Sequence, residues 1–290
     1  MKYIKLMRVK HYIKNLLIFA ALACSGQILN TDKLIPTLLG FIAFCAVASC
    51  VYIINDIRDR EKDRNHPTKC NRPIASGAVS VKSAVVMLIV LLIIAAVCSY
   101  FAFNILSVLL LLLYFIINIG YSFGLKNIPI VDITILVLGF LIRVMYGAVI
   151  SGIEISHWLY LTVIALSFYF SLGKRRNELK NIESGDTRKV LKHYPVNFLD
   201  KNMYMCMALA NVFYALWTTD SNTVAMYGTR YLLVTVPIVL LITMKYSLDI
   251  EGESDGDPVE VLMHDKLLLL LCVVYLLAMF FILYLKKMVF

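Results

Sequence analysis

Three aspartates near residue 60 have the spacing of one helix face. The segment from Asn55 to Asp63 reads NDIRDREKD and places Asp56, Asp59 and Asp63 at positions i, i+3 and i+7. Side chains at these intervals lie close together on a helix, so three carboxylates repel one another unless a cation lies between them. Such oxygen ligands suit Mg²⁺, which takes one or two carboxylates and completes its shell with water and substrate phosphate. We therefore expect the three aspartates to be metal ligands and catalytic residues, with Mg²⁺ as the cofactor.

Basic side chains alternate with these aspartates and follow them. Arg58 lies between the first two, and Lys69 and Arg72 come shortly after the third. Lysine and arginine bind phosphate oxygens, arginine often through two hydrogen bonds at once. We expect Arg58, Lys69 and Arg72, together with the amide of Asn55, to bind a phosphorylated substrate. The alternative is a solvated helix end whose mixed charges serve solubility.

Long apolar runs surround this charged segment. The chain has 290 residues, of which 60% are hydrophobic and only 16% charged, too little polar surface for a soluble domain of this length. Runs of about 18 apolar residues or more are long enough to cross a bilayer as helices. We expect an all-α, polytopic membrane protein in which residues 1–290 form a single transmembrane domain. Nine spans can be drawn, roughly 12–30, 34–54, 82–103, 105–122, 128–152, 157–173, 202–219, 228–248 and 265–286.

The basic residues lie mostly on one side of these spans. The N-terminus and the loops after the even-numbered spans hold most of the 28 Lys and Arg residues. This bias is the positive-inside signal, so we expect the N-terminus and the acidic segment to face the cytoplasm at the cell (inner or plasma) membrane. The net charge of +9 then reflects topology, and no nucleic acid is expected as a partner.

The acidic segment and its continuation are characteristic of one family. Asn55-Asp56-x-x-Asp59-x-x-x-Asp63, followed by Arg72-Pro73-Ile74-Ala75-Ser76-Gly77, resembles the first aspartate-rich motif of the UbiA superfamily of membrane prenyltransferases. The resemblance implies nine transmembrane helices around a central cavity open to the cytoplasmic side, and Mg²⁺-diphosphate binding at two acidic motifs. Span count and motif position extend the resemblance over nearly the whole chain.

The second acidic motif departs from the pattern of the family. In place of two aspartates four residues apart, the chain reads Gly173-Lys174-Arg175-Arg176-Asn177-Glu178-Leu179. One acid and three bases favour a substrate pair that carries more phosphate groups. The resemblance leads us to expect Lys174, Arg175 and Arg176 to bind substrate and Glu178 to be a metal ligand, the alternative for Glu178 being a salt bridge with a neighbouring base. Three bases at a helix end also satisfy the positive-inside rule, and this alternative stays open.

Within the superfamily, this segment is similar to the branch of the decaprenyl-phosphate phosphoribosyltransferases. The opening Arg8–Leu16, the segment Tyr121–Asp132 and the late Asp257–Asp265 are similar to the same branch. The resemblance implies an Mg-dependent membrane glycosyltransferase that moves 5-phosphoribosyl from phosphoribosyl diphosphate to a polyprenyl phosphate and releases diphosphate. It also implies that Lys126 binds substrate and that Lys14 holds the lipid headgroup.

Two other functions stay open. A conventional prenyltransferase, which moves a prenyl group from prenyl diphosphate to an aromatic or lipid acceptor, would share the fold and the first motif. The bases at 174–176 argue against it. A transporter or channel would need polar residues near the middle of the membrane, whereas charge here gathers at one surface. The sequence leaves open whether the protein is a homo-oligomer.

Two charged residues lie in or beside the fifth span. Asp132 and Arg143 are eleven residues apart, which is about three helical turns and hence one face. Because charge in lipid is costly, we expect both to face the protein interior or an interface. There Asp132 either orients Lys126 or the metal site, or belongs to a structural pair or an interhelical clamp.

Overall fold

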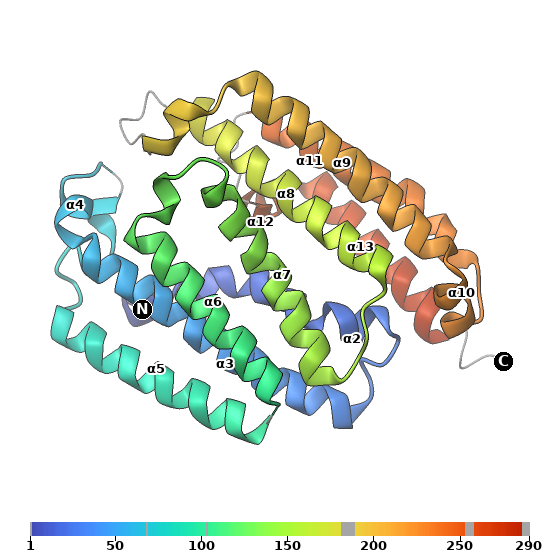
Figure 1. The fold of residues 1–290 in the computed structure, drawn as a ribbon, viewed down its shortest axis with the longest axis horizontal. Helices are drawn as coiled ribbons and strands as arrows, with labels where there is room; N and C mark the ends of the chain where they lie inside the picture. Colours follow the sequence, from blue (N-terminus) through green and yellow to red (C-terminus); the bar gives the residue numbers. More distant parts are fainter. Residues whose placement is uncertain (1, 68, 103, 181–188, 253–257, 286–290) are drawn as a thin grey trace. The chain divides into compact units, whose positions relative to one another are not determined.

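The computed structural model describes residues 2–67, 69–102, 104–180, 189–252 and 258–285, and all regular secondary structure in these ranges is helical (Figure 1). The chain divides into two compact units. Unit 1 comprises Met1–Lys126 and Ile142–Glu154, and unit 2 comprises Asn127–Leu141 and Ile155–Phe290. The predicted single domain over residues 1–290 stays a prediction, because the two units are defined each by itself.

The long helices of unit 1 begin at polar caps. α3 (Thr31–Arg58) follows Asn30, whose side chain accepts from the Asp32 N–H, and α5 (Val81–Phe101) follows Ser80, which caps the Ser83 N–H. α6 (Ile105–Phe123) starts in the same way at Asn104. Each capping oxygen satisfies an amide that the helix itself leaves unpaired. α3 packs against both α5 and α6. The remaining elements are α1 (Lys2–Met7), η1 (Val9–Phe19), α2 (Ala20–Cys24), α4 (Arg60–Arg64), η2 (Lys69–Asn71), η3 (Leu125–Asn127) and α7 (Val131–Ser151).

The N-terminal segment differs from the predicted continuous helix over residues 12–30. It is broken into α1, the 3₁₀-helix η1 and α2. Long 3₁₀ stretches are uncommon because their hydrogen bonds are poorly aligned, so tertiary contacts must hold this one. Tyr12 shares a hydrogen bond of 2.8 Å with Ser49 of α3, and Asn15 donates to the Cys45 thiol of α3 at 3.1 Å. These contacts hold η1 against the C-terminal half of α3, which leads to the acidic segment.

Unit 2 is built around a pair of long helices. α8 (His157–Lys180) packs along α9 (Val196–Thr219), and the unit's core includes Tyr169, Leu199 and Ile250. The first turns of α7 belong to this unit, whereas its second half belongs to unit 1. The other elements are η5 (Lys189–His193), α10 (Ser221–Tyr227), η6 (Tyr231–Thr235), α11 (Val236–Glu251), α12 (Pro258–His264), α13 (Lys266–Phe280) and the π-helical η7 (Phe281–Leu285).

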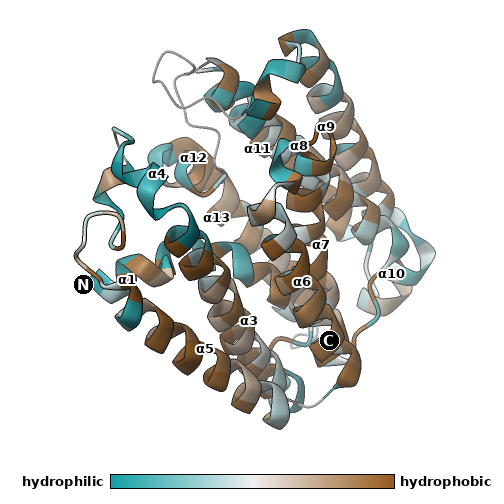
Figure 2. Ribbon diagram, turned by 60° about the vertical axis from the view of Figure 1, so that its left-hand side comes forward, coloured by the Kyte–Doolittle hydropathy of each residue, from teal (hydrophilic) through white to brown (hydrophobic). Residues whose placement is uncertain are grey.

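Six helical stretches within the described ranges are long and apolar enough to cross a membrane. They are Thr31–Arg58, Val81–Phe101, Ile105–Phe123, Val131–Ser151, Tyr231–Glu251 and Lys266–Tyr284. Figure 2 shows α5 hydrophobic along nearly its whole length and the short α4 hydrophilic. Four of the six have at most 28% of their most apolar stretch buried; apolar helices so exposed need lipid as their solvent, so this is a multi-pass membrane protein. The predicted spans 12–30, 157–173 and 202–219 are not among the six, and the count of nine stays a prediction.

Candidate active site

The three aspartates lie where α3 ends. Asp59 is the residue between α3 and α4, and its φ of −87° and ψ of 7° leave the helical region. The hydrogen bonds Asp59 N–H to Asn55 C=O and Asp63 N–H to Asp59 C=O nevertheless continue the helical pattern. At 100° per residue, Asp56 and Asp63 are about 20° apart around the helix axis, whereas Asp59 is turned about 60° from Asp56. This spacing keeps the three aspartates on one side of the helix, but their partners differ: Asp56 and Asp63 share Arg72, whereas Asp59 contacts Lys126.

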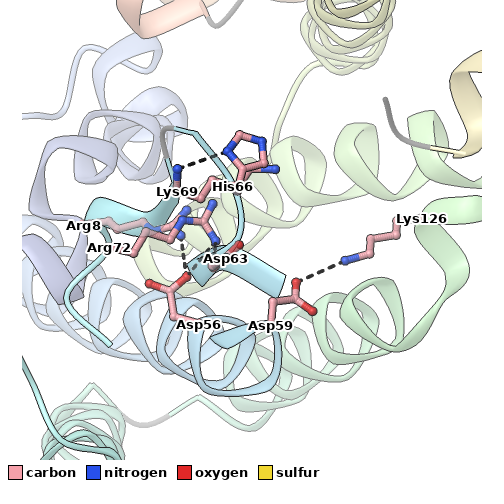
Figure 3. Close-up of polar contacts among 8 residues, drawn as sticks. All are labelled: Arg8, Asp56, Asp59, Asp63, His66, Lys69, Arg72 and Lys126. Carbon is pink, nitrogen blue, oxygen red and sulfur yellow. Dashed lines mark hydrogen bonds and ion pairs between the residues drawn. The ribbon is translucent and has the colours of Figure 1, made fainter. Parts of the chain in front are cut away.

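Arg72 contacts both Asp56 and Asp63. Its guanidinium lies 2.7 Å from Asp63 Oδ2 and 3.3 Å from Asp56 Oδ1 (Figure 3). Asp56 is 2% and Asp63 5% exposed, and ionised carboxylates so far from water need charged or hydrogen-bonding partners. Arg72 reaches them because residues 69–76 fold back through η2 and a following turn, in which the Ser76 N–H donates to the Arg72 C=O at 2.9 Å. The sequence prediction that groups Arg72 with the aspartates agrees with this geometry, while its binding of substrate stays a prediction.

Arg8 also belongs to the charged cluster around Asp56, Asp59 and Asp63, and sequence reasoning missed it. Its guanidinium lies 2.7 Å from Asp56 Oδ1 (Figure 3). The guanidinium also stacks over the Tyr52 ring, 4.7 Å from the centroid. The backbone of Arg8 is left-handed, with φ 54°, which is unusual for a residue with a side chain and is retained where the surroundings enforce it. The sequence predicts Lys14, further along η1, as the N-terminal base. The sequence feature that points to Arg8 is its position as the first residue of Arg8–Leu16, the segment that is similar to the phosphoribosyltransferase branch.

Asp59 faces a different base. Lys126 of η3 places its Nζ 3.5 Å from Asp59 Oδ2, on the opposite side from the two arginines in Figure 3. Gly124, with φ 138°, ends α6 and turns the chain into η3; a residue with a Cβ would be strained there. Both side chains keep part of their surface exposed, 23% for Asp59 and 28% for Lys126. This pair is therefore partly open to solvent, as are the side chains of Arg8 and Arg72.

Other predicted substrate-binding residues of this segment make structural contacts. Arg58 donates to the Ser122 carbonyl and stacks on the Phe123 ring at 4.3 Å, which fixes the end of α6 against α3. The Lys69 N–H donates to His66 Nδ1 at 3.2 Å, within the loop that carries Arg72. Asn55 contributes its backbone carbonyl to the Asp59 turn. Substrate binding by these residues and by Lys14 stays a prediction.

The donor set fits a metal that arrives with phosphate ligands. Within the described ranges, no three His, Cys, Asp or Glu side chains are grouped closely enough to hold a metal ion by themselves. Mg²⁺ rarely uses an all-protein cage: one or two carboxylates hold it while substrate phosphates and water fill the other positions. Asp56 and Asp63 on one side and Asp59 on the other offer such carboxylates, with arginine and lysine beside them. Carboxylates with neighbouring bases suit a divalent metal that arrives with phosphate ligands.

In unit 2, the predicted basic triplet does not form one patch. Arg175 is fully buried and donates to Asp132 Oδ2 at 2.6 Å and to Glu178 Oε2 at 2.7 Å. Arg176 pairs with Asp200 of α9. Successive helical side chains point about 100° apart, so neighbours in sequence face different elements of the unit. Arg175 and Arg176 thus have internal carboxylate partners, and their contact with substrate stays a prediction.

Tyr194 completes the contacts of Asp132. The Tyr194 hydroxyl donates to Asp132 Oδ1 and accepts the Ile130 N–H at 2.6 Å. Ile130 has φ 67°, a left-handed conformation that a β-branched residue adopts only under constraint. Burial raises the pKa of Tyr194, and the hydrogen bond to Asp132 raises it further, so this phenol keeps its proton and remains a donor at physiological pH.

Asp132 and Arg143 do not pair with each other. Asp132 is held by Arg175, as described above, in unit 2. Arg143 lies in unit 1, where it donates to Asn15 Oδ1 at 2.8 Å and to the Tyr114 hydroxyl at 3.1 Å. Its guanidinium also lies over the Phe44 ring, 5.2 Å from the centroid. Both residues face the protein interior, as the cost of charge in lipid predicts, and each ties separate chain segments together.

Comparison with known proteins places the chain in a family. The model of the UbiA prenyltransferase family matches residues 16–264. The chain belongs to the UbiA prenyltransferase family. This membership confirms the expectation drawn from the first aspartate-rich motif.

Relatives of known name are similar over almost the entire chain. A decaprenyl-phosphate phosphoribosyltransferase of Corynebacterium glutamicum is 33% identical, covering 98% of this chain and 87% of that protein. One from Mycolicibacterium smegmatis is 34% identical over 92% and 88%. The structure of an Archaeoglobus fulgidus UbiA homologue bound to GPP and Mg²⁺ matches 98% of this chain and 99% of that one, with a TM-score of 0.72 at 22% identity. At that identity, the structural match supports the UbiA fold alone.

Proposed function

We propose that this UbiA-family protein transfers 5-phosphoribosyl from phosphoribosyl diphosphate to a polyprenyl phosphate and releases diphosphate, with Mg²⁺ as cofactor. Near-full-length similarity to two phosphoribosyltransferases supports the choice of donor and acceptor. The structural observation that carries the proposal is the convergence of Arg8 and Arg72 on Asp56. Carboxylates for a metal and guanidiniums for phosphate oxygens then occupy one place in unit 1.

The proposed reaction is a substitution at the anomeric carbon of ribose. The bond between C1 and the diphosphate oxygen breaks, its electron pair leaves with diphosphate, and an oxygen of the lipid phosphate forms the new bond with inversion. A bound Mg²⁺ supplies Lewis-acid neutralisation of the departing charge. A phosphate monoester is largely anionic near neutral pH, so the acceptor needs no strong general base. Its obstacle is repulsion between two phosphorylated substrates.

The basic side chains address this repulsion. Arg8 and Arg72 are placed to bind diphosphate oxygens beside the metal carboxylates, and Lys126 to stabilise the charge that develops near Asp59. Lys14 of η1 remains the proposed contact of the lipid headgroup. In the second motif, we retain Glu178 as a metal ligand and Lys174 as a phosphate-binding base. Within these assignments, each residue either holds charge in position or neutralises it, and proton transfer is not required.

The polarity of the donor supports a location at the cytoplasmic surface of the cell membrane. Phosphoribosyl diphosphate carries several negative charges and does not enter the hydrocarbon region, so the site must open to water on the side that supplies it. The bias of Lys and Arg places the N-terminus and the acidic segment on the cytoplasmic side. We propose this orientation together with the function.

A transfer assay with the donor labelled at two positions tests the proposal. Purified protein is incubated with Mg²⁺, a polyprenyl phosphate and phosphoribosyl diphosphate labelled in the ribose or in the β-phosphate. We expect ribose label in the organic phase and β-phosphate label in the aqueous phase, and no transfer after chelation of the metal. Absence of ribose label from the lipid, with turnover of a prenyl diphosphate in a parallel reaction, would instead support the conventional prenyltransferase.

Replacement of Arg8 by glycine tests its contact with the diphosphate. Glycine accepts the left-handed backbone at this position without strain, so Arg8→Gly removes the guanidinium and leaves the turn. We expect the KM for phosphoribosyl diphosphate to rise about tenfold, the effect of one charge-assisted hydrogen bond of roughly 1.5 kcal/mol. Steady-state kinetics with Lys5→Ala, an exposed base of α1, give the matched comparison. An unchanged KM in Arg8→Gly would remove Arg8 from the site.

A further inference from the structure

The buried end of α8 contains an arginine, Arg175, that contacts the carboxylates of Asp132 and Glu178. Arg175 has no exposed surface, and neither has Asp132, which accepts from its Nε at 2.6 Å. The second partner, Glu178, lies one helical turn further on, accepts from Nη1 at 2.7 Å and keeps 20% of its side chain exposed. Glu178 is thus the member of this trio that a ligand from solvent reaches.

The other side of Asp132 is fixed as well. Tyr194 donates to its second oxygen, and the same hydroxyl accepts the N–H of the strained Ile130. Three chain segments therefore meet at one carboxylate: the start of α7, the end of α8 and the residue that follows η5. Hydrogen bonds in a buried network reinforce one another, and each member has little freedom to turn. This network therefore fixes the orientation of the Arg175 guanidinium, which in turn contacts Glu178.

We propose that Arg175 is a positioning residue: it does not contact substrate but holds the Glu178 carboxylate in place for a divalent metal, and Asp132 and Tyr194 hold Arg175. The proposal rests on the proposed function for the identity of the metal-bound phosphate. The position of Arg175 in a basic triplet suggests phosphate binding. The proposal assigns it a different role. A guanidinium is suited to this role because its planar fork contacts two carboxylates in fixed directions.

The chemistry of the trio supports this assignment. Arg175 has no exposed surface, so a substrate phosphate would contact it only after neighbouring groups moved, and displacement of Asp132 would leave a buried carboxylate without its cation, which is strongly destabilising. A metal that binds Glu178 leaves both contacts of Arg175 intact. Partners that orient metal ligands in this way contribute about 10- to 100-fold to metal affinity or activity.

Four variants of the full-length protein separate the two roles. Glu178→Gln replaces the metal-binding carboxylate by an amide, which is a weaker ligand. Arg175→Lys keeps the positive charge but removes the planar guanidinium. The double variant combines both changes. Tyr194→Phe removes one hydroxyl at the far end of the network and is the mildest change to folding. Lys192→Ala replaces an exposed base of η5 and is the matched control. The first readout is binding of Mn²⁺ to the purified protein in the presence of inorganic diphosphate, and thermal unfolding in detergent verifies folding.

We expect Glu178→Gln and Arg175→Lys to weaken Mn²⁺ binding by a similar factor, about tenfold or more, and the double variant to be no weaker than Glu178→Gln. Tyr194→Phe weakens binding in the same direction by about two- to fivefold, and Lys192→Ala binds as the unaltered protein does. In the transfer assay, Arg175→Lys lowers kcat and leaves the KM of both substrates within about twofold.

Three results would overturn the proposal. One is Mn²⁺ affinity unchanged in folded Arg175→Lys and Tyr194→Phe, another is unchanged affinity in Glu178→Gln, and the third is a double variant whose loss is the product of the two single losses. The last result, with a raised KM for either substrate, would make Arg175 a direct phosphate ligand. Failure of the proposed function has a different signature: the unaltered protein binds Mn²⁺ and diphosphate but transfers no phosphoribosyl group.

Discussion

Asp59→Asn is expected to lower turnover by about 10³-fold without changing the amount of folded protein in the membrane. An amide is a weaker ligand than a carboxylate and carries no charge, so a metal shared with the departing diphosphate loses several kcal/mol of charge stabilisation. At about 1.4 kcal/mol for each factor of ten, a loss of roughly 4 kcal/mol corresponds to this decrease. The measurement is kcat in the transfer assay, with thermal unfolding in detergent as the check on folding.

Glu61→Gln is the matched control for this change. Glu61 lies two residues from Asp59, on α4, but its side chain is 69% exposed and pairs with Arg60 and Arg64 at the surface. Exposed ion pairs contribute little to stability, so the same chemical change should leave kcat within about twofold. Equal rates in Asp59→Asn and Glu61→Gln would contradict the assignment of Asp59 as a metal ligand.

Gly147→Ala is expected to cause the largest loss of stability from a single methyl group. A Cβ at Gly147 would lie 1.8 Å from the carbonyl oxygen of Ile18 and 2.9 Å from its Cα. Both are backbone atoms of η1, so no side chain can turn away to make room. Overpacking of this kind costs about 1–3 kcal/mol or more, and we expect the apparent unfolding temperature in detergent to fall by roughly 5–10 °C. Activity should fall as well, because η1 follows directly on Arg8.

Gly120→Ala provides the comparison for the same substitution in another long helix. The nearest atom to its added Cβ is Leu125 Cδ1 at 3.0 Å, the far end of a flexible side chain. Alanine also favours the helix over glycine by about 1 kcal/mol. Unfolding of Gly120→Ala should therefore occur within about 2 °C of the unaltered protein. If Gly147→Ala unfolds at that temperature too, η1 does not pack against α7 as closely as the structure shows.

Much of the fold is predictable because a bilayer imposes the length of an apolar run. The predicted span 105–122 corresponds to α6 (Ile105–Phe123), and 82–103 corresponds to α5 (Val81–Phe101). The N-terminal segment could not be predicted in the same way. Its 3₁₀ geometry depends on contacts such as Asn15 with Cys45 and Ile18 with Gly147, which join residues far apart in the sequence.

The same distinction holds for the site. The spacing of Asp56, Asp59 and Asp63 indicated a phosphate–metal cluster, because carboxylates at helical intervals are close whatever else the chain does. Arg8 escaped prediction because a left-handed residue breaks the helical register, so spacing no longer indicates which side chains share a face. Arg175 was grouped with its neighbours because sequence alone does not indicate which face of α8 is buried.

A competition between two donors distinguishes phosphoribosyl transfer from prenyl transfer. Purified protein, Mg²⁺ and a polyprenyl phosphate are mixed with equal amounts of phosphoribosyl diphosphate and a prenyl diphosphate, each carrying a distinct label, and the lipid products are separated. We expect the unaltered protein to form a lipid product that carries the phosphoribosyl label, and Asp59→Asn to form almost none of it. A product that carries only the prenyl label would contradict this expectation.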